Sequence, residues 1–253
     1  RQLTVVLSAM VVLLAVCAAP LLAIVARALP ALLDAQGLAV LTEPDTLRAL
    51  GNTLRFSAAA LALAVLLGIT HALSARALGA WGLAWRAAAF LPFVVSPVTV
   101  AFGLLLLYPR WAASLPLLVA AYALIAYPFV AKSLTAALDA LPEHIAQAAA
   151  TLGASPWRVF VRVTLPLVAP ALRRGLAFAA ATALGEFAVS LFLSRPEWTT
   201  LTTLIYQRLG RPGAANLDAA LVLACLLMAI ALLAFLLIEG AGRRHNDPHA
   251  RTA

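Results

Sequence analysis

The chain has 253 residues, of which 64% are hydrophobic and only 11% are charged. A soluble domain carries about a quarter charged residues, so this composition excludes a soluble globular protein and predicts an all-α, polytopic membrane protein. The net charge of +8 does not indicate nucleic-acid binding, because lysines and arginines in a membrane protein mainly record which side its loops face.

Six transmembrane helices are predicted, since a helix needs about 20 apolar residues to cross the hydrocarbon core. The first is expected to stay as an anchor, because it is too long for a cleaved signal peptide and is followed by little signal-like sequence. We treat residues 1–253 as a single transmembrane domain. The spans are roughly 3–28, 52–75, 87–108, 112–132, 170–194 and 217–239.

Prolines lie inside two of these predicted spans. Pro92 and Pro97 fall in the third, and Pro116 and Pro128 fall in the fourth. Proline removes a backbone hydrogen bond from a helix, so both helices are expected to be kinked or to begin late.

The basic residues indicate the orientation of the chain. If the N-terminus is cytoplasmic, most of the 18 Lys and Arg residues lie in or beside segments on that side, as the positive-inside rule requires. Both termini are therefore predicted to be cytoplasmic. The longest inner loop, about 133–169, is then cytoplasmic, and 196–216 lies on the opposite side.

That inner loop is predicted to contain a short helix that ends at a glycine corner. Pro142 suits a first helical turn, where the charge of Glu143 complements the positive end of the helix dipole. Gly153 is placed to end the helix in a left-handed conformation. Apolar residues recur between these points at three- and four-residue spacing, namely Ile145, Ala148, Ala149 and Leu152.

A second helix is expected after the corner, with Ser155 as its cap and Pro156 at its first position. Arg158 and Arg162 lie on it before Pro166.

Two interpretations of the loop remain open on physical grounds. It is either an interfacial helix whose arginines meet anionic lipid, or a docking element whose small alanines let another protein approach closely.

The stretch 147–166 resembles the EAA loop of inner-membrane permeases of binding-protein-dependent ABC importers, in which E-A-A-x-x-x-G is followed later by L-P. The resemblance extends over about residues 50–240 and includes Tyr127–Val130. The matching residues are Gln147, Ala148, Ala149, Gly153, Leu165 and Pro166, with Ala154, Ser155 and Pro156 in a common form of the second half. The glutamate of the motif is replaced by Gln147, so altered coupling contacts rather than lost docking are expected.

The resemblance implies a type I importer permease in the inner membrane, with a coupling helix in the loop 133–169. Its partners would be a cytoplasmic ATP-binding cassette ATPase dimer, a second permease subunit or half, identical or paralogous, and an extracytoplasmic solute-binding protein. The chain has no G-x-x-x-x-G-K-[ST] phosphate loop, so the ATPase is expected on a separate polypeptide, and this chain is expected to need no cofactor. The residues expected to contact the ATPase are Glu143, Gln147, Ala148, Ala149, Gly153, Ala154, Ser155 and Pro156.

A pathway or gate site is expected at Gly185, Glu186 and Phe187. A carboxylate at membrane depth is costly and usually faces a cavity or a partner, although Glu186 could equally serve as a structural hydrogen-bond acceptor between helices. The segment from Ser190 to Gln207 is similar to the iron(III) and thiamine branch of the family, where it forms an external gate. The resemblance therefore implies iron(III) or a thiamine-like solute, with molybdate or sulfate as the alternative.

Other functional classes fit the sequence poorly. The four histidines form no H-E-x-x-H pair, no G-x-S-x-G elbow is present, and both cysteines lie in apolar runs, so neither an enzyme nor a metal site is expected. A secondary transporter or channel is the alternative of another class. It predicts inverted repeats with broken helices, which we do not find, and it leaves the loop at 147–166 unexplained.

Overall fold

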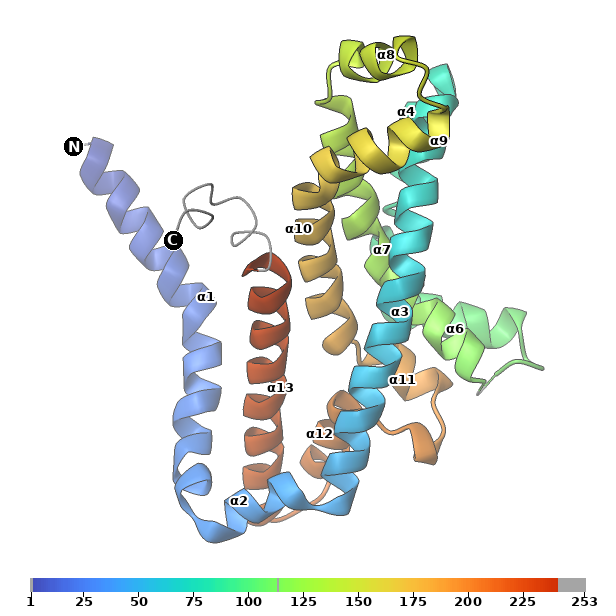
Figure 1. Cartoon of the computed structure of the whole chain (residues 1–253). Helices are drawn as coiled ribbons and strands as arrows, with labels where there is room; N and C mark the ends of the chain where they lie inside the picture. Colours follow the sequence, from blue (N-terminus) through green and yellow to red (C-terminus); the bar gives the residue numbers. More distant parts are fainter. Residues whose placement is uncertain (1, 113, 241–253) are drawn as a thin grey trace, which may run out of the picture. The chain divides into compact units, whose positions relative to one another are not determined.

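A computed structural model of the chain describes residues 2–112 and 114–240, without the side chains of residues 2, 3, 36, 143 and 146. Every regular element in these ranges is helical (Figure 1), which confirms the all-α prediction. Five helical runs are long and apolar enough to cross a membrane, and a bent pair supplies a sixth. The five are α1 (Gln2–Leu33), α3 (Pro44–Ala77), α7 (Leu115–Asp139), the run 156–184 that ends with α10 (Leu165–Leu184), and α13 (Ala214–Gly240).

The predicted third span, 87–108, is not one straight helix. It is replaced by α4 (Gly82–Ala88), α5 (Leu91–Val94) and α6 (Pro97–Leu107). The segments 79–94 and 97–107 meet at an angle of 93°. Ser96 has a ψ of 140°, the extended conformation that a following proline imposes on its neighbour, so the chain breaks directly before Pro97.

The boundaries of the predicted fifth span, 170–194, also differ from the structure. The helical run begins with α9 (Pro156–Val159), passes through a π-helical turn at Phe160–Thr164, and ends with α10 at Leu184. A separate short helix, α11 (Ala188–Leu193), follows. The residues between the two helices, 185–187, include the predicted gate, so this part of the chain is a helix break rather than the middle of a span.

The chain divides into two compact units, each of which is described by itself. The first contains residues up to 51 together with 199–229. It comprises α1, α2 (Ala35–Thr42), the start of α3, α12 (Leu201–Leu209) and the first part of α13. The most apolar stretch of α1 has no buried residue, so its large side chains are available to lipid or to another subunit.

The second unit contains residues 52–198 and the chain from 230 onward, and it carries both predicted sites. Its core is built where α7 packs against α3 and α10, with Tyr122 as the largest fully buried side chain. Small residues allow this close approach. A methyl group added at Gly68 would lie 2.6 Å from Cγ1 of Val130, and one added at Gly175 would lie 2.9 Å from the carbonyl oxygen of Phe129.

Candidate functional site

The predicted loop helix is α8 (Glu143–Thr151), which begins after Pro142. Glu143 is its first residue, and the Glu143 side chain lies outside the described part of the structure. Gln147 and Ala148 are exposed and Ala149 is half-buried. The helix therefore presents its alanines on an open surface of the second unit, which Figure 1 shows at the same end of this unit as α4 and α9.

The corner after α8 is a complete Schellman motif. Gly153 has a φ of +79°, the left-handed conformation predicted for it. Its N–H donates to the carbonyl of Ala150 (2.9 Å), and the N–H of Ala154 donates to the carbonyl of Ala149 (3.2 Å). These are the two bonds by which the motif satisfies the last carbonyls of a helix, so the direction of the chain after α8 is set by Gly153.

The second loop helix, α9, begins as predicted with Pro156 at its first position, after Ser155. The predicted capping bond is wrong, because the Ser155 side chain makes no cap hydrogen bond. The π-helical turn at 160–164 lies directly before Leu165 and Pro166. Pro166 has no N–H to donate to the carbonyl one helical turn earlier, and insertion of such a turn is one way a helix accommodates the missing bond.

Two large apolar side chains flank the corner and are open to solvent. Leu152 is 88% exposed and Trp157 is 73% exposed. Trp157 contacts Phe160, with 5.9 Å between the ring centroids, which limits its motion. Trp157 ends the Gly-Ala-Ser-Pro-Trp form of the motif but is not among the residues predicted to contact the ATPase, although a large apolar side chain at such a corner is itself a signal of a contact surface.

Glu186 is buried in the second unit, with 8% of its surface exposed. Its Oε1 accepts a hydrogen bond from the N–H of Val189 (3.1 Å), the second residue of α11. The carboxylate therefore satisfies one of the free N–H groups at the start of a helix. Within this chain the geometry matches the structural alternative, in which Glu186 holds α11 in place.

Two side chains that bond to this region, Tyr122 and Ser190, are not among the residues predicted from the sequence. The Tyr122 hydroxyl donates to the carbonyl of Glu186 (3.2 Å) and shares a short hydrogen bond with the Ser190 hydroxyl. Tyr122 lies on α7, so the helix break at 185–187 is tied to the core of the unit. Phe187 is half-buried and Gly185 is exposed; only carbonyl oxygens of the preceding turn come within 4 Å of a methyl group added at Gly185.

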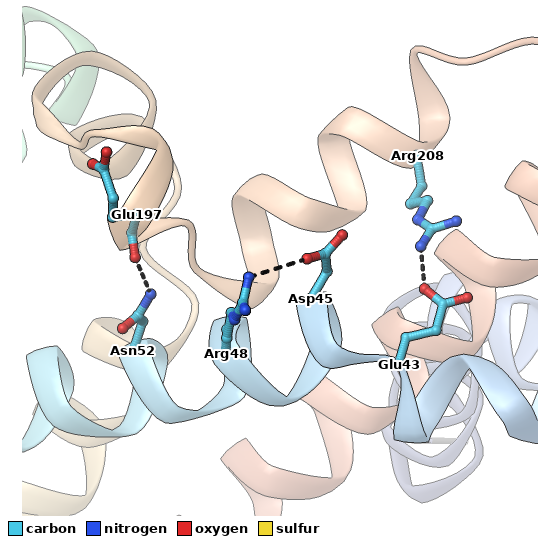
Figure 2. A network of polar contacts seen from close by, with 6 residues as sticks. All are labelled: Glu43, Asp45, Arg48, Asn52, Glu197 and Arg208. Atoms are coloured by element: carbon cyan, nitrogen blue, oxygen red, sulfur yellow. Dashed lines mark hydrogen bonds and ion pairs between the residues drawn. The ribbon is translucent and has the colours of Figure 1, made fainter.

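The segment predicted to face the opposite side of the membrane, 196–216, carries several polar contacts (Figure 2). In the second unit, the side-chain amide of Asn52 donates to the carbonyl of Glu197 (2.9 Å). In the first unit, Arg208 forms an ion pair with Glu43, and these side chains are 17% and 34% exposed. Arg208 is thus a partly buried residue that is paired within this unit.

No group of three or more His, Cys, Asp or Glu side chains that could hold a metal ion occurs within the described residues. Cys17 is exposed and Cys225 is half-buried, and both are free.

Comparison with known proteins identifies relatives of the chain. Residues 86–246 match the family described as binding-protein-dependent transport system inner membrane component. The molybdenum transport system permease protein ModB of Mycobacterium tuberculosis is 35% identical over 225 residues, covering 81% of this chain and 82% of that protein. The putative 2-aminoethylphosphonate transport system permease protein PhnV of Salmonella typhimurium is 30% identical, covering 72% and 69%. ModB of Haemophilus influenzae is 36% identical, over 48% of this chain and 54% of that protein.

A solved structure has the same fold. A crystal structure of a bacterial alginate ABC transporter, in complex with an alginate pentasaccharide-bound periplasmic protein, contains a chain that matches with a TM-score of 0.75. The match covers 97% of this chain and 95% of that one at 20% sequence identity, so it shows the fold alone.

Proposed function

Because the chain belongs to the family of binding-protein-dependent transport system inner membrane components, we propose that it forms half of a solute pathway driven by a separate ATPase. The chain itself is a multi-pass permease subunit of an ABC importer. Four further features are proposed below: the surface that receives the ATPase, the segment that gates the pathway, the orientation in the membrane, and the class of solute.

The ATPase-docking surface is proposed to be α8 with the corner that follows it. The observation that carries this proposal is the Schellman corner at Gly153 between two exposed apolar side chains, Leu152 at 88% and Trp157 at 73%. Burying a leucine or an aromatic side chain contributes about 1.5–3 kcal/mol, so two such residues on a rigid corner suit a groove on a partner. Gln147 is exposed on α8 and offers an amide, which can hydrogen-bond but cannot form a salt bridge.

The gate is proposed to be the helix break at 185–187 with α11. α11 packs on α6, where Phe102 and Phe192 contact each other edge to face with 6.5 Å between their centroids. Glu186 holds the first turn of α11 through the hydrogen bond that its carboxylate accepts from the N–H of Val189. We therefore assign Glu186 a positioning role at the gate, with Gly185 and Phe187 as the neighbouring residues.

The proposed orientation places both termini and the loop 133–169 in the cytoplasm, and 196–216 on the opposite side. The basic-residue bias supports this arrangement. In the complete transporter, a cytoplasmic ATPase dimer would contact α8, a second identical or paralogous permease subunit would complete the pathway, and a solute-binding protein would deliver the solute from outside.

The solute is proposed to be a small oxyanion, with molybdate as the first candidate. The relatives named as molybdenum and 2-aminoethylphosphonate permeases support this class, because molybdate and phosphonates both carry negatively charged oxygen atoms. Iron(III) and thiamine-like solutes, which the sequence between Ser190 and Gln207 suggests, remain the second candidates. Mass spectrometry of the ligand retained by the co-expressed binding protein decides between them, because each class has a distinct mass and charge.

Alanine substitution of the exposed apolar pair tests the docking proposal. Leu152→Ala and Trp157→Ala should each reduce the amount of ATPase that co-purifies with the permease. A loss of about 1.4 kcal/mol of binding free energy lowers the affinity ~10-fold, so at least that reduction is expected. Trp111→Ala is the matched control, because Trp111 is 58% exposed and lies after α6, outside the loop and away from α4, α8 and α9 in the sequence. Equal ATPase recovery in all three variants would contradict the assignment.

A further inference from the structure

A cavity with a volume of about 230 Å³ lies outside both sites described above, in the second unit, and charged side chains stand among its apolar lining residues. Residues of α3, α4, α7 and the segment after α4 line it. A cavity of this volume can hold a small polyatomic ligand or several water molecules, since one water molecule needs only about 10–15 Å³. The lining residues are His71, Arg86, Ala89, Phe90, Ala131, Lys132, Thr135, Ala136 and Asp139.

The charges around this cavity do not balance. Arg86 and Asp139 neutralise each other through a two-point ion pair, with nitrogen–oxygen distances of 2.5 and 3.1 Å. Lys132 forms an ion pair with none of the described carboxylates. Its ammonium group lies 5.5 Å from the centre of the Phe90 ring, which orients the cation without removing its charge. One unpaired positive charge therefore remains at the wall of the cavity.

The cavity wall also holds polar groups that lack partners. His71 is 7% exposed, and its Nε2 atom has no hydrogen-bond partner within the described residues. The same is true of Nε of Arg86. A buried polar atom without a partner costs about 1–3 kcal/mol, so such atoms usually mark a place where a bound group or water completes the bonding. The His71 ring is stacked on Trp85 (5.0 Å, 11°), which fixes its plane.

We propose that this cavity binds a small tetrahedral oxyanion, such as sulfate, phosphate or molybdate. The Lys132 ammonium supplies the charge, and the Thr135 hydroxyl and the Nε–H of Arg86, which has no partner within the described residues, supply further donors. A cation does not fit, because the single carboxylate in the wall, Asp139, is held by both terminal nitrogens of Arg86.

The same chemistry can come from two sources, a free oxyanion or the phosphate of a lipid headgroup. Asp139 is the last residue of α7, and α8 begins at Glu143, so the cavity lies close in sequence to the loop proposed to meet the ATPase. The binding site itself does not depend on the proposed transport role, since binding can be measured on the full chain alone.

Equilibrium binding to the full chain in nanodiscs of neutral lipid tests the proposal. Labelled sulfate, inorganic phosphate and molybdate are the probes, and native mass spectrometry after reconstitution with phosphatidylglycerol reports a retained anionic lipid. Lys132→Gln removes the charge at an exposed residue, Lys132→Arg keeps it, and Arg174→Gln is the matched control on an exposed arginine outside the cavity.

Binding of one of these oxyanions that falls about tenfold or more in Lys132→Gln, as expected for a lost charged hydrogen bond, supports the free-ion source. Retention of phosphatidylglycerol with the same dependence supports the lipid source. In both cases Lys132→Arg should restore most of the binding and Arg174→Gln should leave it unchanged. No binding of any probe to the wild-type chain, or equal binding to all four proteins, would overturn the proposal.

Discussion

Replacing Gly153 should weaken ATPase docking by straining one backbone position. Gly153 has a φ of +79°, and a methyl group added there meets no atom within 4 Å. A substitution therefore creates no clash, and its cost comes only from the left-handed backbone, about 1–2 kcal/mol for a residue with a Cβ atom. A β-branched residue is less tolerant of this region, so Gly153→Val should cost more than Gly153→Ala.

The strain at position 153 should weaken ATPase docking in steps that follow its size. A difference of 1–2 kcal/mol changes an equilibrium about 5- to 30-fold. The amount of ATPase that co-purifies should therefore fall about 5- to 30-fold for Gly153→Ala and further for Gly153→Val. Gly153→Asn should stay close to the wild type, because asparagine adopts the left-handed conformation with less strain.

The assay is titration of the purified ATPase onto the permease in nanodiscs, with solute-stimulated ATP hydrolysis as the second readout. Gly103→Ala is the matched control, because Gly103 also meets no atom within 4 Å but has no positive φ. Equal affinity for the Val, Ala and Asn variants would refute the reasoning, since it would show that the corner at Gly153 does not position the docking surface.

Three further predictions concern other parts of the chain. Glu186→Gln should transport nearly normally because an amide oxygen still accepts from the N–H of α11, whereas Glu186→Ala leaves that N–H without its partner, a loss of about 1–3 kcal/mol, and should lower uptake. Glu43→Arg and Arg208→Glu should each lower the free energy of unfolding by an amount on the order of 1 kcal/mol, seen as a lower thermal unfolding temperature, and the double variant should recover part of this loss. In a cysteine-free background, Ala154→Cys and Ala214→Cys should react with an impermeant thiol reagent from opposite sides of the membrane.

Each of these predictions has a contradicting outcome. Normal uptake by the Glu186→Ala variant at normal expression would show that its bond to α11 is dispensable. Additive losses in the double charge exchange would show that Glu43 and Arg208 do not act as a pair. Labelling of the Ala154→Cys variant from outside intact cells would reverse the proposed topology.

The sequence predicted the features that depend on neighbouring residues. Gly153 follows an alanine-rich helix and precedes Ser-Pro, so a left-handed end was predictable from local chemistry alone. The break before Pro97 was expected as a kink, but its angle of 93° depends on how α6 packs. Contacts between distant residues were not predictable, because a single sequence does not indicate which polar groups meet. Tyr122 and Glu186 are 64 positions apart, and Glu43 and Arg208 are 165 apart.

Uptake by the reconstituted complex tests the central claim most directly. The permease, its ATPase and its binding protein are placed in proteoliposomes, and accumulation of labelled molybdate, followed by the second-candidate solutes, is measured with and without ATP. We predict accumulation of one solute that requires both ATP and the binding protein and that is lost in the Trp157→Ala variant. Uptake that persists without ATP and the binding protein, driven by an ion gradient, would contradict the proposed mechanism and identify a secondary transporter.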